Sequence, residues 1–179
     1  GKYGIETVST DAGRAIRLAD EISGVVVAKD GNYIWKKGNR SLRNQIMAIQ
    51  GEQMSEEGNS LAVCLDTILA YEGIVRNSGY MLRRGDSVIK ILEESLEDAQ
   101  VLDLTGCTLD SVLYYVNRDI PVLAMMQDGS AVLVVGFNEK NTVVMNPETG
   151  TVYKVGMNDS TEWFEQNGNR FITYIRSEQ

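Results

Sequence analysis

The sequence predicts an α+β protein, and three observations carry this prediction. Apolar residues recur at helical spacing through much of the first two thirds of the chain, whereas residues 121–175 form short apolar runs separated by polar turns. Helical and strand patterns are therefore segregated, which favours helices packed on a mostly antiparallel sheet over alternating βα units. With 179 residues, 43% hydrophobic composition and two prolines, the chain is also large enough for one domain with a sizeable core.

We divide the chain into an amino-terminal extension, residues 1–52, and a helix-plus-sheet core, residues 53–179, which together are expected to form one compact domain. In the extension, apolar residues three apart predict a helix over residues 9–22. Two β-rich runs then flank Asp30-Gly31, a pair that supplies the positive φ of a tight hairpin turn. Residues 42–50 fit either a strand or a helix.

Residues 59–72 form the strongest helical pattern in the chain. Asn59 or Ser60 is the expected N-cap, and Gly73 is the expected carboxyl-terminal stop. Apolar residues occupy more than one side of this helix, which predicts that it is central and buried. The residues at the 3–4 spacing are Leu61, Cys64, Leu65, Ile68, Leu69 and Glu72.

The remaining elements are predicted from the helical spacing of apolar residues and from short apolar runs between polar turns. We expect helices over 85–98, 108–119 and 160–168, and strands over 99–106, 121–126, 131–137, 141–146, 151–155 and 171–175. The stretches YIWKKGN and YMLRRGD share an aromatic residue, two apolar residues, two basic residues and a glycine. We interpret both as the same kind of turn.

Composition narrows the range of functions. A net charge of −8 and a pI near 4.6 speak against nucleic acid as a partner. The basic cluster of Lys36, Lys37, Arg40 and Arg43 is interpreted as a solvated surface in preference to an anion site. No apolar run approaches the roughly 18–20 residues of a membrane span, so a membrane would be reached only through a segment outside this chain. We expect no cofactor and no metal, because two cysteines without a histidine make neither a zinc site nor a disulfide framework, and no phosphate-binding motif is present.

Five motifs occur in a specific order: LAVCLDTILAYEG, NRDIPVLAM, SAVLVVGF, VVMNPETG and TEWFEQNGNRFITYI. In this order and spacing they resemble the bacteriocin-leader (double-glycine) peptidase family, a branch of the papain-like cysteine peptidases. The resemblance covers about two thirds of the chain, residues 53–175, and implies a papain-like fold with a central helix packed on an antiparallel sheet.

Carried over position by position, the resemblance implies a site without its catalytic residues. Ser60 occupies the position of the family's cysteine, at the amino end of the central helix, and Ser130 occupies that of the histidine. Asn146, before Pro147, matches the orienting Asp or Asn. Gln53 is the candidate for the oxyanion-hole glutamine, although its spacing is one residue longer than the family's.

The chain contains no histidine, so a Ser60 nucleophile would lack its usual base. Capping of the helix is the simpler role for Ser60. Cys64 lies within the apolar stripe, where a cysteine packs as a small hydrophobe with a raised pKa. We therefore expect no catalytic residues and no enzymatic activity.

Three functional classes remain. We prefer a non-catalytic papain-like domain that binds a peptide or protein through the former substrate cleft, within a larger bacterial protein. The alternatives are a structural or assembly domain without a cleft function, and a residual cysteine- or serine-type peptidase. The resemblance leaves the compartment open, with an extracytoplasmic or membrane-associated domain as one expectation.

Overall fold

The computed structural model describes residues 11–37 and 59–176. Its helices are α1 (Ala12–Ile22), α2 (Ser60–Tyr71), α3 (Ser78–Arg83), α4 (Val88–Ser95), α5 (Leu109–Val116) and α6 (Met157–Gln166). Its strands are β1 (Val25–Val27), β2 (Tyr33–Lys36), β3 (Ala99–Asp103), β4 (Val122–Met125), β5 (Ala131–Phe137), β6 (Asn141–Met145), β7 (Val152–Gly156) and β8 (Arg170–Arg176).

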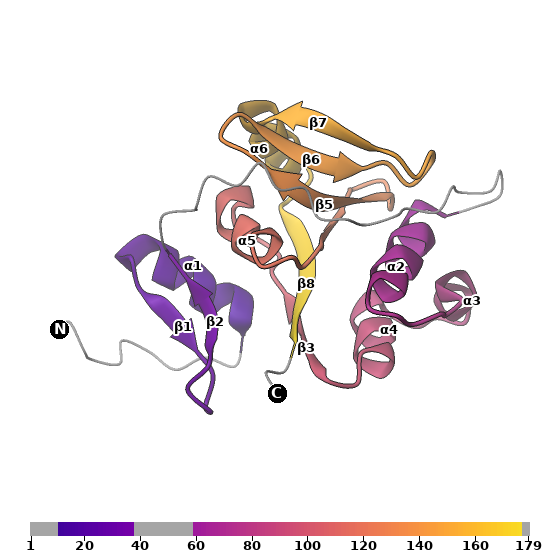
Figure 1. The fold of residues 1–179 in the computed structure, drawn as a ribbon, viewed down its shortest axis with the longest axis horizontal. Coiled ribbons are helices and arrows are strands. Elements are labelled where there is room, and N and C mark those ends of the chain that lie inside the picture. The colour runs from indigo at the N-terminus through magenta and orange to yellow at the C-terminus, as the bar shows by residue number, and fades with distance from the viewer. Residues whose placement is uncertain (1–10, 38–58, 177–179) are drawn as a thin grey trace.

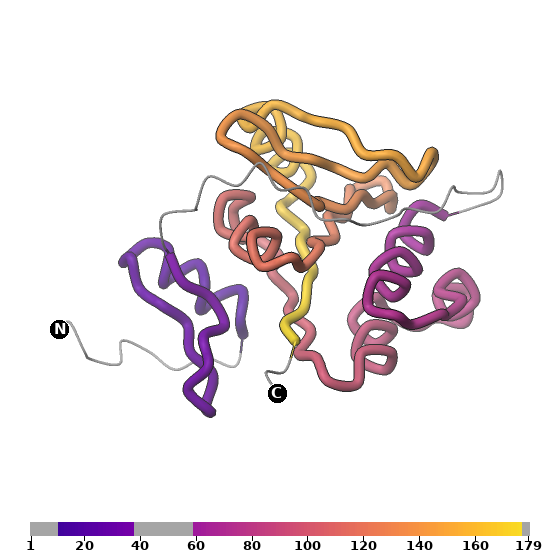
Figure 2. The backbone as a smooth tube through the Cα atoms, in the orientation of Figure 1, coloured from indigo at the N-terminus to yellow at the C-terminus, as the bar shows by residue number. Residues whose placement is uncertain are grey.

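The strands form a two-stranded hairpin, β1–β2, and a six-stranded sheet in the order β3-β8-β4-β5-β6-β7. All neighbouring strands of the larger sheet are antiparallel. The chain therefore has the α+β layout that the sequence predicts, with the last strand inserted between β3 and β4. Figure 2 shows this strand, in yellow, returning through the middle of the molecule.

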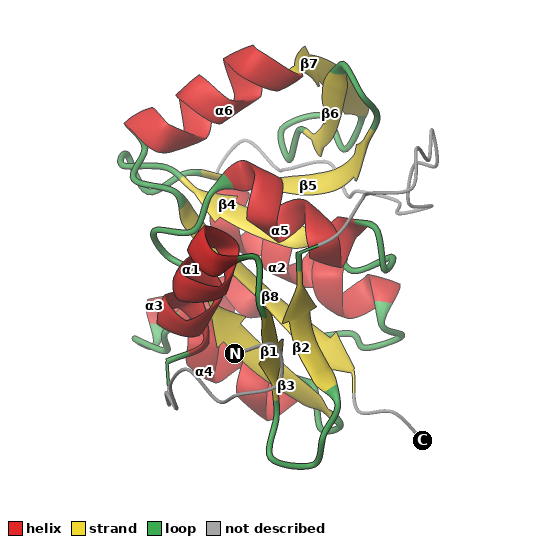
Figure 3. Ribbon diagram, turned by 90° about the vertical axis from the view of Figure 1, so that its left-hand side faces the viewer, coloured by secondary structure: helices red, strands yellow, loops and turns green. Residues whose placement is uncertain are grey.

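Helices cover the sheet from two sides. In Figure 1, α2, α3 and α4 lie on one side of β8, and α1, the hairpin and α5 lie on the other. The view turned by 90° agrees, because α1, α5 and the hairpin stand in front of β8 and β3 (Figure 3). Helix α6 accompanies β6 and β7 at the far end of the sheet.

Helix α2 is the central helix of the core, as the sequence predicts. Its residues Cys64, Leu65 and Leu69 are completely buried. The helix is bounded by Asn59, whose side chain accepts hydrogen bonds from the first turn, and by Gly73 at φ 81°. A glycine pays no steric penalty for that left-handed conformation, which explains why the helix stops there.

The amino-terminal helix and hairpin pack against the core through buried polar contacts. Trp35 Nε1 donates to the backbone oxygen of Ser111 at 2.9 Å, and Tyr115 Oη donates to the backbone oxygen of Ile34 at 2.9 Å. Helix α1 approaches β3 so closely that a Cβ atom at Gly13 would lie 2.9 Å from the Asp103 carbonyl oxygen. A glycine is therefore required at this crossing.

Helix α3 was not predicted from the sequence, and the interpretation of YIWKKGN and YMLRRGD as the same kind of turn is wrong. YMLR, expected to mark the same turn as YIWK, belongs to α3, whereas YIWK is strand β2. Helix α3 begins at the Asn77 cap, and the Asp66 side chain holds the backbone N–H of Ser78 at 2.9 Å. This tertiary contact is not visible in the local pattern, so the shared residues do not fix the structure.

The expected boundaries of the other elements differ from the observed ones by up to three residues at an end, most often because the expected helices extend past their caps. Residues 42–50, which fitted a strand or a helix, lie outside the described residues. Among the helices that the structure describes, none is long and apolar enough to cross a bilayer.

Candidate functional site

The candidate site begins at the amino end of α2. Asn59 is the N-cap, with its Oδ1 accepting from the backbone N–H of Leu61 at 2.9 Å. Ser60 is the first helical residue, and its Oγ accepts a hydrogen bond from the backbone N–H of Ala131 at 3.1 Å. The expectation that Ser60 caps the helix together with Asn59 is therefore wrong in part, because the Ser60 hydroxyl binds the first residue of β5 instead.

Ser130 lies directly before that contact, in the turn that joins β4 to β5. Its hydroxyl donates to Asp128 Oδ1 at 2.5 Å, and its backbone N–H donates to the same oxygen at 2.9 Å. The two hydrogen bonds from Ser130, the side-chain bond first, lower the pKa of Asp128. The structure thus brings Ser60 and Ser130 to the same end of the α2–β5 interface, with Asp128 as the partner of Ser130.

Asn146 follows the last residue of β6. The register pairs Met145, the residue before it, with Leu133 of β5. The Asn146 side chain serves its own turn, however, with Oδ1 accepting from the backbone N–H of Glu148 at 2.9 Å. The hydrogen bonds of the described residues do not join Asn146 to Ser60 or to Ser130. Gln53 lies outside the described residues.

Both cysteines are free and buried. Burial raises the pKa of the Cys64 thiol, and Cys64 sits in the middle of α2 with no exposed surface. Burial also raises the pKa of Cys107 to about 11, and its thiol donates to the backbone oxygen of Gly13 at 3.4 Å. Thiolates are the reactive form, so both cysteines are packing residues.

Among the described residues, the interactions at this site are hydrogen bonds. Ser60 and Ser130 are each engaged by a backbone amide or a carboxylate, and neither contacts a basic side chain among the hydrogen bonds described. No group of three or more His, Cys, Asp or Glu side chains in the described part of the chain is arranged to hold a metal ion. Sequence reasoning missed Asp128, although the string Asp128-Gly129-Ser130 is a typical side-chain-capped turn.

The chain is similar to a protein from Bacillus anthracis whose crystal structure is described as that of a C39-like peptidase, with a TM-score of 0.62 at 12% identity. That match covers 76% of this chain and 100% of the other. A second match is a double-glycine-motif protease from an AMS/PCAT transporter, solved with its leader peptide, with a TM-score of 0.53 at 15% identity. It covers 76% of this chain and 97% of the other.

The described chain therefore has the papain-like α+β fold of C39-like peptidases, which confirms the resemblance drawn from the five motifs. At these identities the likeness concerns the fold alone. No protein-family model matches the chain, and no curated protein sequence matches it. Both matches span nearly the whole of the other chain, and each leaves about a quarter of this chain unmatched.

Proposed function

We propose that this domain has a peptidase fold without peptidase activity, and that it binds a peptide or protein partner at the amino end of α2 within a larger bacterial protein. One observation carries the proposal: the residues that the resemblance assigns to the nucleophile and the base are two hydroxyls, Ser60 and Ser130, in a chain without histidine. A peptide is supported as the type of ligand because one protein of the same fold was solved in complex with a leader peptide.

Proton chemistry supports the absence of activity. Cleavage of a peptide bond needs a base to activate the nucleophile and an acid to protonate the leaving amine. The carboxylate beside Ser130 is Asp128, and its lowered pKa makes it a weaker base than an ordinary aspartate. The oxygen of Ser60 accepts from a backbone amide, and no hydrogen bond among the described residues links the Ser60 proton to a base.

The first prediction concerns turnover. We expect the purified protein to cleave no member of a peptide library, as measured by mass spectrometry, and Ser60 to remain unlabelled by serine-directed covalent probes. General acid–base catalysis alone increases the rate by about 10²–10⁴, and the chain has no histidine, the residue that usually provides it. The double variant Ser60→Cys, Ser130→His should recover at most slight activity, because the imidazole would also need an orienting partner. Turnover by the unmodified protein that disappears in Ser60→Ala would contradict this part of the proposal.

The second prediction concerns binding. We expect a displayed peptide library to yield ligands whose affinity falls about tenfold or more in Ser60→Arg, since an arginine there would occupy the space before β5. The matched control is Ala70→Arg, which places the same side chain on the exposed far end of the same helix. Calorimetric titration would give both affinities, and thermal unfolding would confirm that each variant is folded.

Two outcomes would count against peptide binding at this end of α2. Selected peptides that bind Ser60→Arg and the unmodified protein equally would place the site elsewhere. A library that yields no ligand would favour the structural or assembly role.

A further inference from the structure

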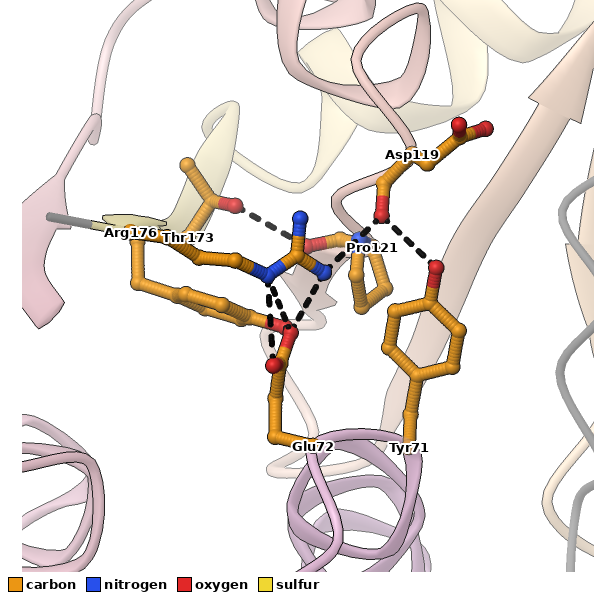
Figure 4. Close-up of polar contacts among 7 residues, drawn as sticks. Tyr71, Glu72, Asp119, Pro121, Thr173 and Arg176 are labelled. Carbon is orange, nitrogen blue, oxygen red and sulfur yellow. Dashed lines mark hydrogen bonds and ion pairs between the residues drawn. The ribbon is translucent and has the colours of Figure 1, made fainter. Parts of the chain in front are cut away.

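The other end of α2 is joined to β8 by a polar cluster (Figure 4). Tyr174 Oη donates to Glu72 Oε1 at 2.5 Å, and Arg176 Nε donates to the same oxygen at 2.9 Å. Burial acts to raise the pKa of Glu72, but the hydrogen bonds from Arg176 and Tyr174 outweigh it and lower that pKa. Glu72 is therefore ionised at neutral pH, and its charge compensates that of Arg176.

Beside this cluster lies a cavity of about 270 Å³ between the β1–β2 hairpin, α5 and the edge of the sheet. Its apolar wall includes Ile34 of β2, Ile120 before β4 and Ile175 of β8. Gln100 of β3 also lines it, and the register pairs Gln100 with Ile175, which places both side chains on this face of the sheet. The lining is therefore mixed, because polar and charged side chains, among them Asp30, Asn32 and Arg118, outnumber the isoleucines.

The walls of the cavity are held in place by the packing of the hairpin. The backbone oxygen of Ile34 is bound by Tyr115 Oη, and Trp35 is anchored on α5 through Ser111. Both donors are buried, with Trp35 2% exposed and Tyr115 0% exposed. Since these contacts fix β2 relative to α5, the cavity is preformed and no rearrangement is needed to open it.

The cavity is lined by Arg118, an exposed residue that has no ion-pair partner among the residues that the structure describes. Arg118 Nη1 donates to Tyr114 Oη at 3.2 Å, and its guanidinium lies over the Tyr114 ring at 5.5 Å from the centroid. In the described ranges 11–37 and 59–176, no carboxylate forms an ion pair with Arg118. Asp30, across the cavity at the hairpin turn, accepts from the backbone and side chain of Asn32 instead.

This cavity is separate from the candidate site at Ser60. Helix α2 has 12 residues, so its two ends lie about 18 Å apart. Ser60 stands at one end, and the cluster of Glu72 and Arg176, which borders the cavity, stands at the other.

We propose that the cavity is a second binding site, and that it takes a small monocarboxylate with a compact apolar body. The carboxylate binds Arg118, whose planar guanidinium offers paired donors, and the body packs against the isoleucine wall. The volume lies just below the usual range for ligand pockets, which selects a small molecule. The Asp30 carboxylate at the rim disfavours a ligand with two negative charges.

The test compares 3-phenylpropionate with its amide, 3-phenylpropionamide, which has nearly the same shape and no charge. Backbone amide shifts of the isotope-labelled full chain would report both affinities and the place of binding. We expect saturable binding of the acid, with shifts at residues around Arg118 and Ile34. The amide should bind about tenfold or more weakly, because it lacks the charge-assisted hydrogen bonds.

Three variants separate binding at this site from general effects. Arg118→Gln should weaken binding of the acid about tenfold or more, while Arg83→Gln, an exposed arginine on α3, should leave it unchanged. Gln100→Glu adds a negative charge to the wall without touching Arg118, and it should also weaken binding of the acid while leaving binding of the amide unaffected.

Several results would overturn the proposal. These are the absence of saturable binding of the acid at millimolar concentrations, equal affinity for acid and amide, or unchanged affinity in Arg118→Gln. Shifts centred on Ser60 and Ala131 would assign the carboxylate to the other end of α2, and would also refute this site. Because the proposal is independent of peptide binding at Ser60, failure of either one leaves the other standing.

Discussion

Replacing Trp35 with alanine should lower the free energy of unfolding by about 3–5 kcal/mol. The indole is 2% exposed, and it packs near Tyr114 with ring centroids 6.4 Å apart. Its removal leaves a cavity between the hairpin and α5, and it deprives the Ser111 carbonyl of its Nε1 donor. Denaturant titration with a common slope would measure the change as a shift of the midpoint.

Tyr33 provides the matched control, because it is an aromatic residue on the same strand with 55% of its surface exposed. Tyr33→Ala should lower the free energy of unfolding by less than about 1 kcal/mol, as expected for a surface substitution. Equal effects of the two substitutions would mean that the hairpin contributes little to the stability of the core. An unfolding curve of Trp35→Ala with two separate transitions would show that residues 11–37 unfold independently of the rest.

Local signals in the sequence account for the elements that were predicted well. The central helix is bounded by a cap residue, Asn59, and by Gly73 at positive φ, and both are visible without any tertiary information. The first hairpin follows from Asp30-Gly31, and Gly31 has a φ of 88°. The antiparallel strands from residue 121 onward follow from short apolar runs separated by polar turns, and their order along the chain is largely their order in the sheet.

Elements that depend on distant contacts were not predictable. The four residues YMLR became a helix because Asn77 caps it and Asp66 holds its first turn, whereas the similar YIWK became a strand paired with β1. The insertion of β8 between β3 and β4 is also invisible in the order of the strands along the chain.

The candidate site, too, was predictable only where local sequence signals determine it. The motif spacing placed Ser60 and Ser130, and the structure shows Ser60 bound to the residue after Ser130. The cavity beside Arg118 had no signal in the sequence, because its walls join residues that lie far apart in the chain. Trp35 and Ser111 are 76 residues apart, and Ile34 and Tyr115 are 81 residues apart. Only the packing of the hairpin on α5 creates that site.

The second large effect is expected at the centre of α2. Leu65→Ala should lower the free energy of unfolding by about 2–5 kcal/mol, because the side chain has no exposed surface and close-packed surroundings relax only partly around a cavity. The helix also positions Ser60 against β5 at one end and Glu72 against β8 at the other. A cavity in the middle of α2 should therefore weaken both the contact of Ser60 with β5 and the contact of Glu72 with β8.

Leu61→Ala is the control for that substitution, since it removes the same atoms from the first turn of the same helix, where the side chain is half-buried. Less apolar surface is lost there, so the cost should be about half or less of that at Leu65. Chemical denaturation of both variants, alongside amide exchange in α2, would measure the difference. If Leu61→Ala cost as much as Leu65→Ala, the helix would be packed as tightly at its amino end as in its middle, and that end would lack the accessible surface that peptide binding requires.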